Sequence, residues 1–419
     1  MSWPSHTDYQ DAIQNPQICF EEASLKLSEI GCDMLGMPRV ISGNFASVYS
    51  VTTGGERWAI RCFVRQVLGQ QGRYARLSQS LFGLGLPCMV AFEYILRGIK
   101  VRNEWYPIVK MAWVEGLPLN QWVEENYRDA KALTDMAAKW VVMMKQLRDN
   151  NLAHSDLQHG NVMVTTTNEL RLVDYDGMYT PAFKGRSPEM GHANFQHPRR
   201  TPEFYNEQLD NFASLIIYTT FLAYAAEPDL FNKFFTGDNL LFLSGDYRNP
   251  QSSEAIKRLK ESTDQKVKDL ATLIEKVCLM DVSRVPEFGA VAEAVEKGTI
   301  SELIKALEGP APVAAPAPAP AARPAPSVAA PKPAAAPMST PMTRPVAPVS
   351  APKAPVAPRP PAPRASPLSA PKPAARPAAQ APAHAPAKAA GPGGLPMWFW
   401  IAIGAGILIF VAMFIFGRK

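Results

Sequence analysis

The sequence predicts an α+β domain in which a small β-rich lobe precedes a larger helical lobe, followed by a linker and one membrane-spanning helix. Residues 40–63 alternate apolar and polar side chains around a Gly-Gly turn at 54–55, which is typical of a β-hairpin of two strands. After Asp129, apolar residues recur at spacings of three and four, which is typical of amphipathic helices. Strands that come first and helices that come second favour an α+β arrangement of two lobes.

Composition sets the expected boundaries within the 419 residues. The first part of the chain, about 300 residues, has the composition of a globular protein, which is enough for one two-lobed domain. From about residue 310 to 390 nearly every residue is Ala, Pro, Val, Ser, Lys or Arg. We therefore expect an N-terminal extension packing on the small lobe at residues 1–35, a folded domain at 36–308 (small lobe about 36–113, helical lobe about 114–308), a Pro/Ala-rich disordered linker at 309–396, a membrane span at 397–416 and a short basic tail at 417–419.

The basic character of the chain lies in the linker. The formal net charge is +5, but residues 309–396 carry nine basic and no acidic side chains. Before the linker, 32 basic residues face 38 acidic ones, a net charge near −6. We therefore expect no nucleic-acid binding by the folded domain. Alternating Ala and Pro favour a semi-rigid spacer, whose sparse charges serve either to solvate it or to contact anionic lipid head groups.

The C-terminal segment has the length and composition of a membrane span. Residues 397–416, MWFWIAIGAGILIFVAMFIF, form an uncharged run of 20 residues. A helix of this length spans about 30 Å, the thickness of the hydrocarbon core of a bilayer. Trp398 and Trp400 lie at one end, as interfacial aromatic residues do. Ala402 and Gly406 form a small-residue pair that would allow a helix homodimer.

The cysteines and the N-terminus favour a reducing compartment for the folded domain. The five cysteines are irregularly spaced and include no Cys-x-x-Cys pair, so neither a disulfide framework nor a zinc site is expected. The first ten residues, MSWPSHTDYQ, lack the basic and apolar regions of a secretory signal. We expect reduced thiols in a cytosolic domain.

Three polar residues have the chemistry of phosphoryl transfer. Asp156 and Asn161 lie in the polar loop HSDLQHGN, which enters a short strand, and Asp174 ends the next strand. Phosphoryl transfer needs a carboxylate that orients the attacking hydroxyl and hard oxygen ligands that hold Mg²⁺ against the phosphates. Asp156 suits the first role, and Asn161 and Asp174 suit the second as metal ligands. The sequence thus predicts a phosphoryl-transfer site that uses Mg²⁺.

These motifs resemble those of the protein-kinase superfamily over roughly residues 38–300. HSDLQHGN is similar to the catalytic loop H-R-D-L-x-x-x-N, and LVDYD at 172–176, 18 residues further on, is similar to the D-F-G element. GHANFQHPR, DNFA and DVSRVP resemble, in order, the end of the activation segment, the start of the buried helix and the late D-P-x-x-R-P motif. LVDYDGMY with a following HPRR resembles a group of bacterial kinase-like proteins. The resemblance implies a two-lobed protein-kinase-like fold.

The resemblance also implies an ATP site in the small lobe. ISGNFASV at 41–48 resembles the glycine-rich loop, WAIR at 58–61 resembles V-A-I-K, and VKMAWVEG at 109–116 resembles the hinge. The implied nucleotide-binding residues are Gly43, Val48, Ala59, Arg61, Met111 and Val114. Met111 takes the gatekeeper position, and Val114 offers its backbone to adenine.

The sequence departs from the kinase pattern around the phosphates. Arg61 replaces the strand lysine, and no glutamate between Glu56 and Glu93 is present to pair with it. The glycine-rich loop keeps only Gly43. Ser155 replaces the arginine that would anchor a phosphorylated activation loop, so control by loop phosphorylation is not expected.

Three functions fit this pattern. The first is a membrane-anchored, atypical Ser/Thr protein kinase, because the catalytic acid and both metal positions are present. The second is a pseudokinase that acts as a nucleotide-responsive membrane scaffold for a partner protein, which the altered lysine and glycine positions favour. The third is a small-molecule phosphotransferase, which the activation-segment-like stretch after Asp174 disfavours. Because ATP is cytoplasmic, we expect the kinase-like domain on the cytoplasmic side of the membrane.

Overall fold

The structure, a computed structural model, describes residues 3–43, 46–66 and 69–309. Most of the expected linker, the expected membrane span and the Ala402/Gly406 pair lie outside these residues. Among the helices that the structure describes, none is long and apolar enough to cross a bilayer.

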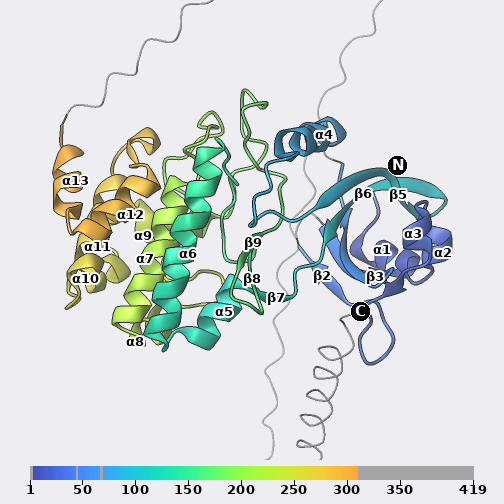
Figure 1. Ribbon diagram of the computed structural model, residues 1–419, viewed down its shortest axis with the longest axis horizontal. Coiled ribbons are helices and arrows are strands. Elements are labelled where there is room, and N and C mark those ends of the chain that lie inside the picture. Colours follow the sequence, from blue (N-terminus) through green and yellow to red (C-terminus); the bar gives the residue numbers. More distant parts are fainter. Residues whose placement is uncertain (1–2, 44–45, 67–68, 310–419) are drawn as a thin grey trace, which may run out of the picture. The chain divides into compact units, whose positions relative to one another are not determined.

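An antiparallel sheet of six strands dominates the first part of the described chain, up to residue 112 (Figure 1). Its strands are β1 (Glu29–Ile30), β2 (Val40–Ser42), β3 (Ala46–Thr53), β4 (Glu56–Phe63), β5 (Phe92–Val101) and β6 (Glu104–Ala112). The order is β1-β3-β4-β6-β5, and β2 pairs with β3. The predicted hairpin is confirmed as β3–β4. The expectation of only two strands in 40–63 was wrong, because Val40–Ser42 forms a separate strand, β2, that pairs antiparallel with β3, and the Gly43 amide donates to the Ala46 carbonyl at 3.0 Å.

The register of the sheet brings several predicted nucleotide-binding residues onto one face. Val48 is paired with Arg61, and Ala59 is paired with Met111 on the neighbouring strand. Arg61 is in turn paired with Val109 of β6. Because directly paired residues of antiparallel strands point to the same side, these five side chains share the face that we call the inner face.

Three short helices cover the opposite, outer face of the sheet. They are α1 (His6–Ile13), α2 (Pro16–Cys19) and α3 (Ala23–Lys26), and Figure 1 shows them beside the sheet. Tyr9 and Ile13 of α1 are fully buried in one hydrophobic cluster with Tyr49, Ile60 and other outer-face residues. The Tyr9 hydroxyl also donates to the Phe63 carbonyl at 2.6 Å. Residues before the sheet therefore complete a core of their own.

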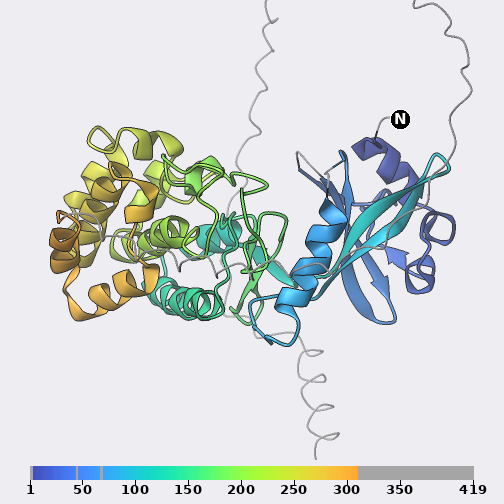
Figure 2. The ribbon, with the colours of Figure 1, turned by 90° about the horizontal axis from the view of Figure 1, so that it is seen from above.

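The inner face receives α4 (Gln70–Leu81), which connects β4 to β5. Tyr74 and Leu77 of this helix are buried in the main hydrophobic core together with Val109 and Met111. In Figure 2, α4 lies between the sheet and the helices of the second half of the chain. This helix is therefore placed to contact both halves.

The second and larger part of the described chain, from residue 116 on, is mostly helical, which confirms the predicted α+β class. A three-stranded antiparallel sheet begins it, with β7 (Gly116–Pro118), β8 (Val162–Thr165) and β9 (Leu170–Leu172). The α-helices are α5 (Leu119–Asn126), α6 (Ala130–Asp149), α7 (Asn211–Ala226), α8 (Asp229–Phe234), α9 (Ser244–Arg248), α10 (Glu254–Lys260), α11 (Gln265–Cys278), α12 (Phe288–Lys297) and α13 (Ile300–Ala306), with 3₁₀ turns at Ala193–Phe195 and Val282–Arg284.

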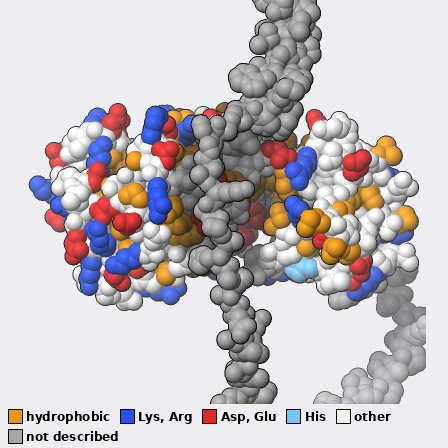
Figure 3. Space-filling view, turned by 90° about the horizontal axis from the view of Figure 1, so that it is seen from below, with side chains coloured by type: hydrophobic (Ala, Val, Ile, Leu, Met, Phe, Trp, Pro, Cys, Tyr) orange, Lys and Arg blue, Asp and Glu red, His pale blue; other side chains and the backbone are white. Residues whose placement is uncertain are grey.

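The helices pack around α7, which the sequence predicts as a buried helix. Thirteen of its 16 residues are buried, and α6, α11 and α12 pack against it. The amphipathic helix expected after Asp129 is α6, and the Asp129 side chain caps it by accepting from the Ala132 amide at 2.9 Å. Acidic and basic side chains intermingle over the helical region in Figure 3, whereas apolar side chains point into this core.

We expect the outer-face core to contribute to the stability of the whole domain. Replacing Ile13, which is fully buried, by Ala should lower the free energy of unfolding by about 2–5 kcal/mol, because it leaves a cavity. Ile18 lies in the next helix but is 72% exposed, so Ile18→Ala should change stability by less than about 0.5 kcal/mol. Denaturant unfolding measures both. Equal effects of the two substitutions would contradict the packing of α1 on the sheet.

Candidate functional site

The predicted catalytic loop, residues 154–161, is anchored by Asp210, the residue directly before α7. The Asp210 carboxylate accepts from the His154 amide and, at 2.8 Å, from the Ser155 amide. The His154 ring also contacts the Val173 carbonyl at 2.9 Å through Nε2. Ser155 has a φ of 74°, and Asp174 has a φ of 66°, which are uncommon for residues other than glycine. Such strain persists where the surroundings fix the backbone, and it is frequent at functional sites.

The strand register explains why Asn161 and Asp174 meet. Val162 of β8 is paired with Leu172 of β9, so the residues just before β8 and just after β9 lie at the same end of this hairpin. The Val173 amide donates to the Asn161 carbonyl at 3.0 Å and extends the pairing by one step. The two residues that the sequence predicts as metal ligands are therefore neighbours in space.

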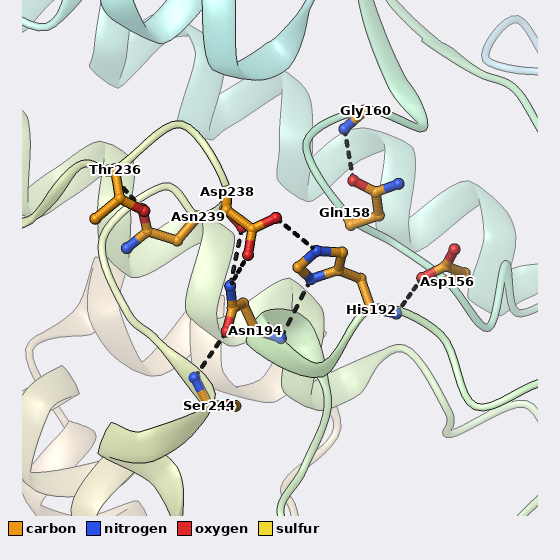
Figure 4. A network of polar contacts seen from close by, with 9 residues as sticks. All are labelled: Asp156, Gln158, Gly160, His192, Asn194, Thr236, Asp238, Asn239 and Ser244. Atoms are coloured by element: carbon orange, nitrogen blue, oxygen red, sulfur yellow. Dashed lines mark hydrogen bonds and ion pairs between the residues drawn. The ribbon is translucent and has the colours of Figure 1, made fainter. Parts of the chain in front are cut away.

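Asp156 is held by two contacts to its carboxylate. Oδ2 accepts from the Asn161 amide nitrogen at 2.9 Å. Oδ1 accepts from the His192 backbone amide at 2.7 Å, the contact that Figure 4 shows. His192 belongs to the segment that follows Asp174, so this segment closes over the catalytic loop. Gly191 has a φ of 72°, and a Cβ there would lie only 2.9 Å from Asp156 Oδ1, which requires glycine at this close approach.

Figure 4 also shows how the His192 side chain is fixed on the far side from Asp156. Its Nε2 lies 3.2 Å from Asp238, and its Nδ1 accepts from the Asn194 amide at 3.3 Å. Because Nδ1 accepts, the ring proton is on Nε2 and points to Asp238. Asn194 itself donates to the Asp238 carboxylate at 3.1 Å. These contacts fix the position of the His192 backbone and hence of the amide on Asp156.

Arg61 reaches across from the sheet to the acids of the predicted D-F-G-like element. Its two terminal nitrogens lie 2.7 and 3.0 Å from the two oxygens of Asp174. One of them also lies 2.8 Å from Asp176. The arginine side chain is only 14% exposed, so this is a largely buried charge with two compensating carboxylates.

Asp176 is the partner of Arg61 that the sequence analysis missed. Because α4 contains no glutamate, Asp176 serves as the additional acidic partner of Arg61. The Tyr74 hydroxyl of α4 donates to Asp176 at 2.5 Å, and Arg73 donates to the Asp176 carbonyl, also at 2.5 Å. Thus α4 contributes a tyrosine and an arginine where the kinase pattern has a glutamate.

The predicted nucleotide-binding residues lie around this ion pair. Val48 and Ala59 are half-buried on the inner face, and Met111 is buried next to Ala59. Val114 is half-buried in the segment after β6, and Gly43 is exposed at the turn between β2 and β3. Four of the six implied residues, including Arg61, therefore share the inner face. The other two, Gly43 and Val114, lie just beyond the ends of β2 and β6.

Glu189 adds a fourth carboxyl group that sequence reasoning did not find. Burial and then the nearby Asp174, Asp176 and Asp156 raise the pKa of Glu189 to about 8. Its carboxyl packs so closely on Gly177 that a Cβ at residue 177 would clash with it. Burial also raises the pKa of Asp176, although Arg61 opposes this rise. The carboxyl groups thus disfavour one another's ionisation, and at neutral pH the Glu189 carboxyl holds a proton.

The side chains of Asn161 and Asp174 fit a metal ion whose remaining ligands come from a bound phosphate group and from water. Within the described ranges, no three His, Cys, Asp or Glu side chains are arranged to hold a metal ion by themselves. Mg²⁺ commonly takes one or two protein ligands and completes its shell with phosphate oxygens and water. The Asp174 carboxylate and the amide oxygen of Asn161 match this smaller set, and a divalent cation beside them would offset the repulsion among the neighbouring carboxyl groups.

His159 lies in the same loop, and its ring packs against two other aromatic rings. Its ring contacts those of His192 and Phe195, with centroids 5.9 and 5.3 Å away. Burial lowers the pKa of His159 to about 4. The ring is therefore neutral at physiological pH and serves as packing beneath the segment that covers Asp156.

No protein-family model matches this sequence, and no curated protein matches it either. The case for a function therefore depends on the geometry of the site.

We expect Glu189 to make the stability of the domain fall as pH rises. Its pKa is about 4.5 in the unfolded chain and about 8 in the fold, so the folded state holds the proton between these values. The free energy of unfolding therefore decreases between about pH 4.5 and 8 and is flat above. Glu189→Gln should remove this loss of stability. The free energy of unfolding of the variant should equal that of wild type near pH 5 and exceed it at pH 9 by up to a few kcal/mol.

Thermal or denaturant unfolding across this pH range measures the effect. Glu203→Gln is the matched control, because the Glu203 side chain is 62% exposed and lies outside the acid cluster. Parallel pH profiles for wild type and Glu189→Gln would show that Glu189 is not a buried, protonated member of the site.

Proposed function

We propose that the domain transfers the γ-phosphate of ATP to a serine or threonine hydroxyl of a protein substrate, as an atypical, membrane-anchored protein kinase. The observation that carries the proposal is the convergence of Asp156, Asn161 and Asp174, joined by direct contacts and by the register of β8 and β9. The architecture supports a two-lobed, protein-kinase-like fold, with an antiparallel sheet and α4 on one side of the site and helices around α7 on the other.

Each residue of the site has a distinct part in this reaction. Asp156 accepts the hydrogen bond of the attacking hydroxyl and orients it toward the phosphate. The Asn161 amide and the His192 backbone amide hold the Asp156 carboxylate in one orientation. Because the carboxylate is fixed before substrate binds, little reorganisation is needed when the hydroxyl arrives.

The nucleotide would bind against the inner face of the sheet. Ala59, Met111 and the Val114 backbone suit the adenine ring, and Gly43 and Arg61 suit the phosphates. Mg²⁺, held by Asn161 and Asp174, supplies neutralisation of the charge that develops on the transferred phosphoryl group. Arg61 has a forked, permanently charged group that can pair with Asp176 and a phosphate oxygen together.

A second candidate, a nucleotide-responsive scaffold without turnover, is favoured by one observation. Arg61 binds both oxygens of Asp174, the carboxylate that would hold the metal. Metal binding must loosen at least one of these contacts. If the pair does not open, ATP could still change the way the two halves of the domain meet, and a partner protein at the membrane would respond to that change.

Phosphoryl transfer by the full chain distinguishes these functions. With Mg²⁺, γ-labelled ATP and a generic protein substrate, we expect labelled protein from wild type and a loss of about 10²–10⁴-fold for Asp156→Asn, because the hydroxyl loses its orienting carboxylate. Asp174→Asn should be similarly impaired. Asp135→Asn is the control, since Asp135 is 59% exposed on α6, where it pairs with Lys131.

Either of two other results would decide against the kinase. Label that persists in both site variants would come from another enzyme. No label from wild type, combined with a melting temperature that ATP raises, would support the scaffold.

A further inference from the structure

Arg200 lies at the end of the segment that covers the catalytic loop and binds several points of the chain at once. Its Nη1 donates to the Ser155 carbonyl at 2.7 Å and also contacts the Gln196 side chain. Its Nη2 donates to Ser155 Oγ at 2.8 Å, to Ser187 Oγ at 3.3 Å and to the Glu189 carbonyl at 3.4 Å. One side chain thus joins the catalytic loop to both ends of the segment 187–196.

The contacts of Arg200 are unusual for a buried cation. The residue is 8% exposed, and the oxygens that it binds are neutral carbonyl, hydroxyl and amide groups. Its Nε has no hydrogen-bond partner among the described residues. The acids Asp210 and Asp156 compensate its charge only through space. A buried charge without a directly paired acid costs stability.

The order of this segment determines the position of the catalytic acid. Between the two points that Arg200 holds, the chain places Gly191 against Asp156 and donates the His192 amide to it. Gln196 strengthens the same connection, because its amide nitrogen donates to the Ser155 carbonyl at 3.3 Å. If Arg200 released the segment, Asp156 would lose one of its two carboxylate contacts.

The segment 177–199 offers few accessible hydroxyl groups whose phosphorylation could order it. The structure describes all of residues 177–199, and only three of them carry hydroxyl groups: Tyr179, Thr180 and Ser187. Thr180 is fully buried and contacts Ser80 at 3.1 Å. Ser187 is 9% exposed, and its hydroxyl donates to the Glu189 carbonyl. Tyr179 is half-buried and packs edge-on against Tyr205.

We infer that Arg200 is a positioning residue that orders the segment 187–196 over Asp156 without a phosphate group, so that the domain is assembled for its reaction as synthesised. For its catalytic consequence this inference rests on the proposed phosphoryl transfer. Its structural part, the ordering of the segment by one arginine, is independent of any activity.

Hydrogen–deuterium exchange on the full chain tests the structural part. In Arg200→Gln, the amides of residues 187–196 should exchange at least about tenfold faster than in wild type, while those of α6 stay protected. Arg200→Lys keeps the charge but cannot fork to both Ser155 oxygens, so it should show a smaller increase. Arg199→Gln is the matched control, because its side chain is exposed and the neighbouring contacts do not depend on it.

Kinetics of the same variants test the catalytic part. We expect kcat of Arg200→Gln to fall about a hundredfold, because the acid is misplaced, while the affinity for ATP is nearly unchanged. Phosphatase treatment of wild type should leave kcat unchanged. Unaltered exchange in both Arg200 variants, or activity that phosphatase abolishes, would overturn the inference. If exchange behaves as expected but wild type transfers no phosphate, the proposed function fails and the ordering role of Arg200 stands.

Discussion

The guanidinium group of Arg61 joins parts of the chain that lie 113 residues apart in sequence. It leaves the inner face of the sheet and contacts Asp174 and Asp176, the two acids that follow β9. With only 14% of this side chain exposed, its charge is stable there because two carboxylates compensate it. Removal of one partner from such a pair commonly costs about 3–5 kcal/mol. The pairing therefore fixes how the sheet meets the segment that carries Asp174, the predicted metal ligand.

The other groups of the site are positioned by contacts that lead away from Arg61. Tyr74 and Arg73 bring α4 onto Asp176, so the helix that packs on the sheet also touches the acid cluster. On the opposite side, Asp210 holds the catalytic loop from the start of the buried helix α7. A carboxylate that is fixed from several directions is preorganised, which is the main contribution that a protein makes to phosphoryl transfer.

Local patterns in the sequence were sufficient for some of these features. The loop HSDLQHGN and the strand before Asp174 are close in the chain, and a single hairpin register brings their polar residues together. The α+β class of the fold followed from the spacing of apolar residues, which alternate in the predicted strands and recur every three to four residues in the predicted helices. In contrast, Asp176 as the partner of Arg61, and Glu189 as a fourth carboxyl group, depend on long-range packing that no local pattern records. The N-terminal extension was expected to pack on the small lobe, but its division into α1–α3 and their place on the outer face of the sheet depend on long-range packing.

We propose that Arg61 and the acids around it form a site for ATP with Mg²⁺. Calorimetric titration of the full chain with ATP, in the presence and absence of Mg²⁺, measures this directly. We expect Mg²⁺ to tighten ATP binding by about tenfold or more in wild type, and Asp174→Asn to lose this gain because the carboxylate ligand is gone. ATP affinity that is indifferent to Mg²⁺, or the absence of ATP binding by the wild-type chain, would show that these residues do not form such a site.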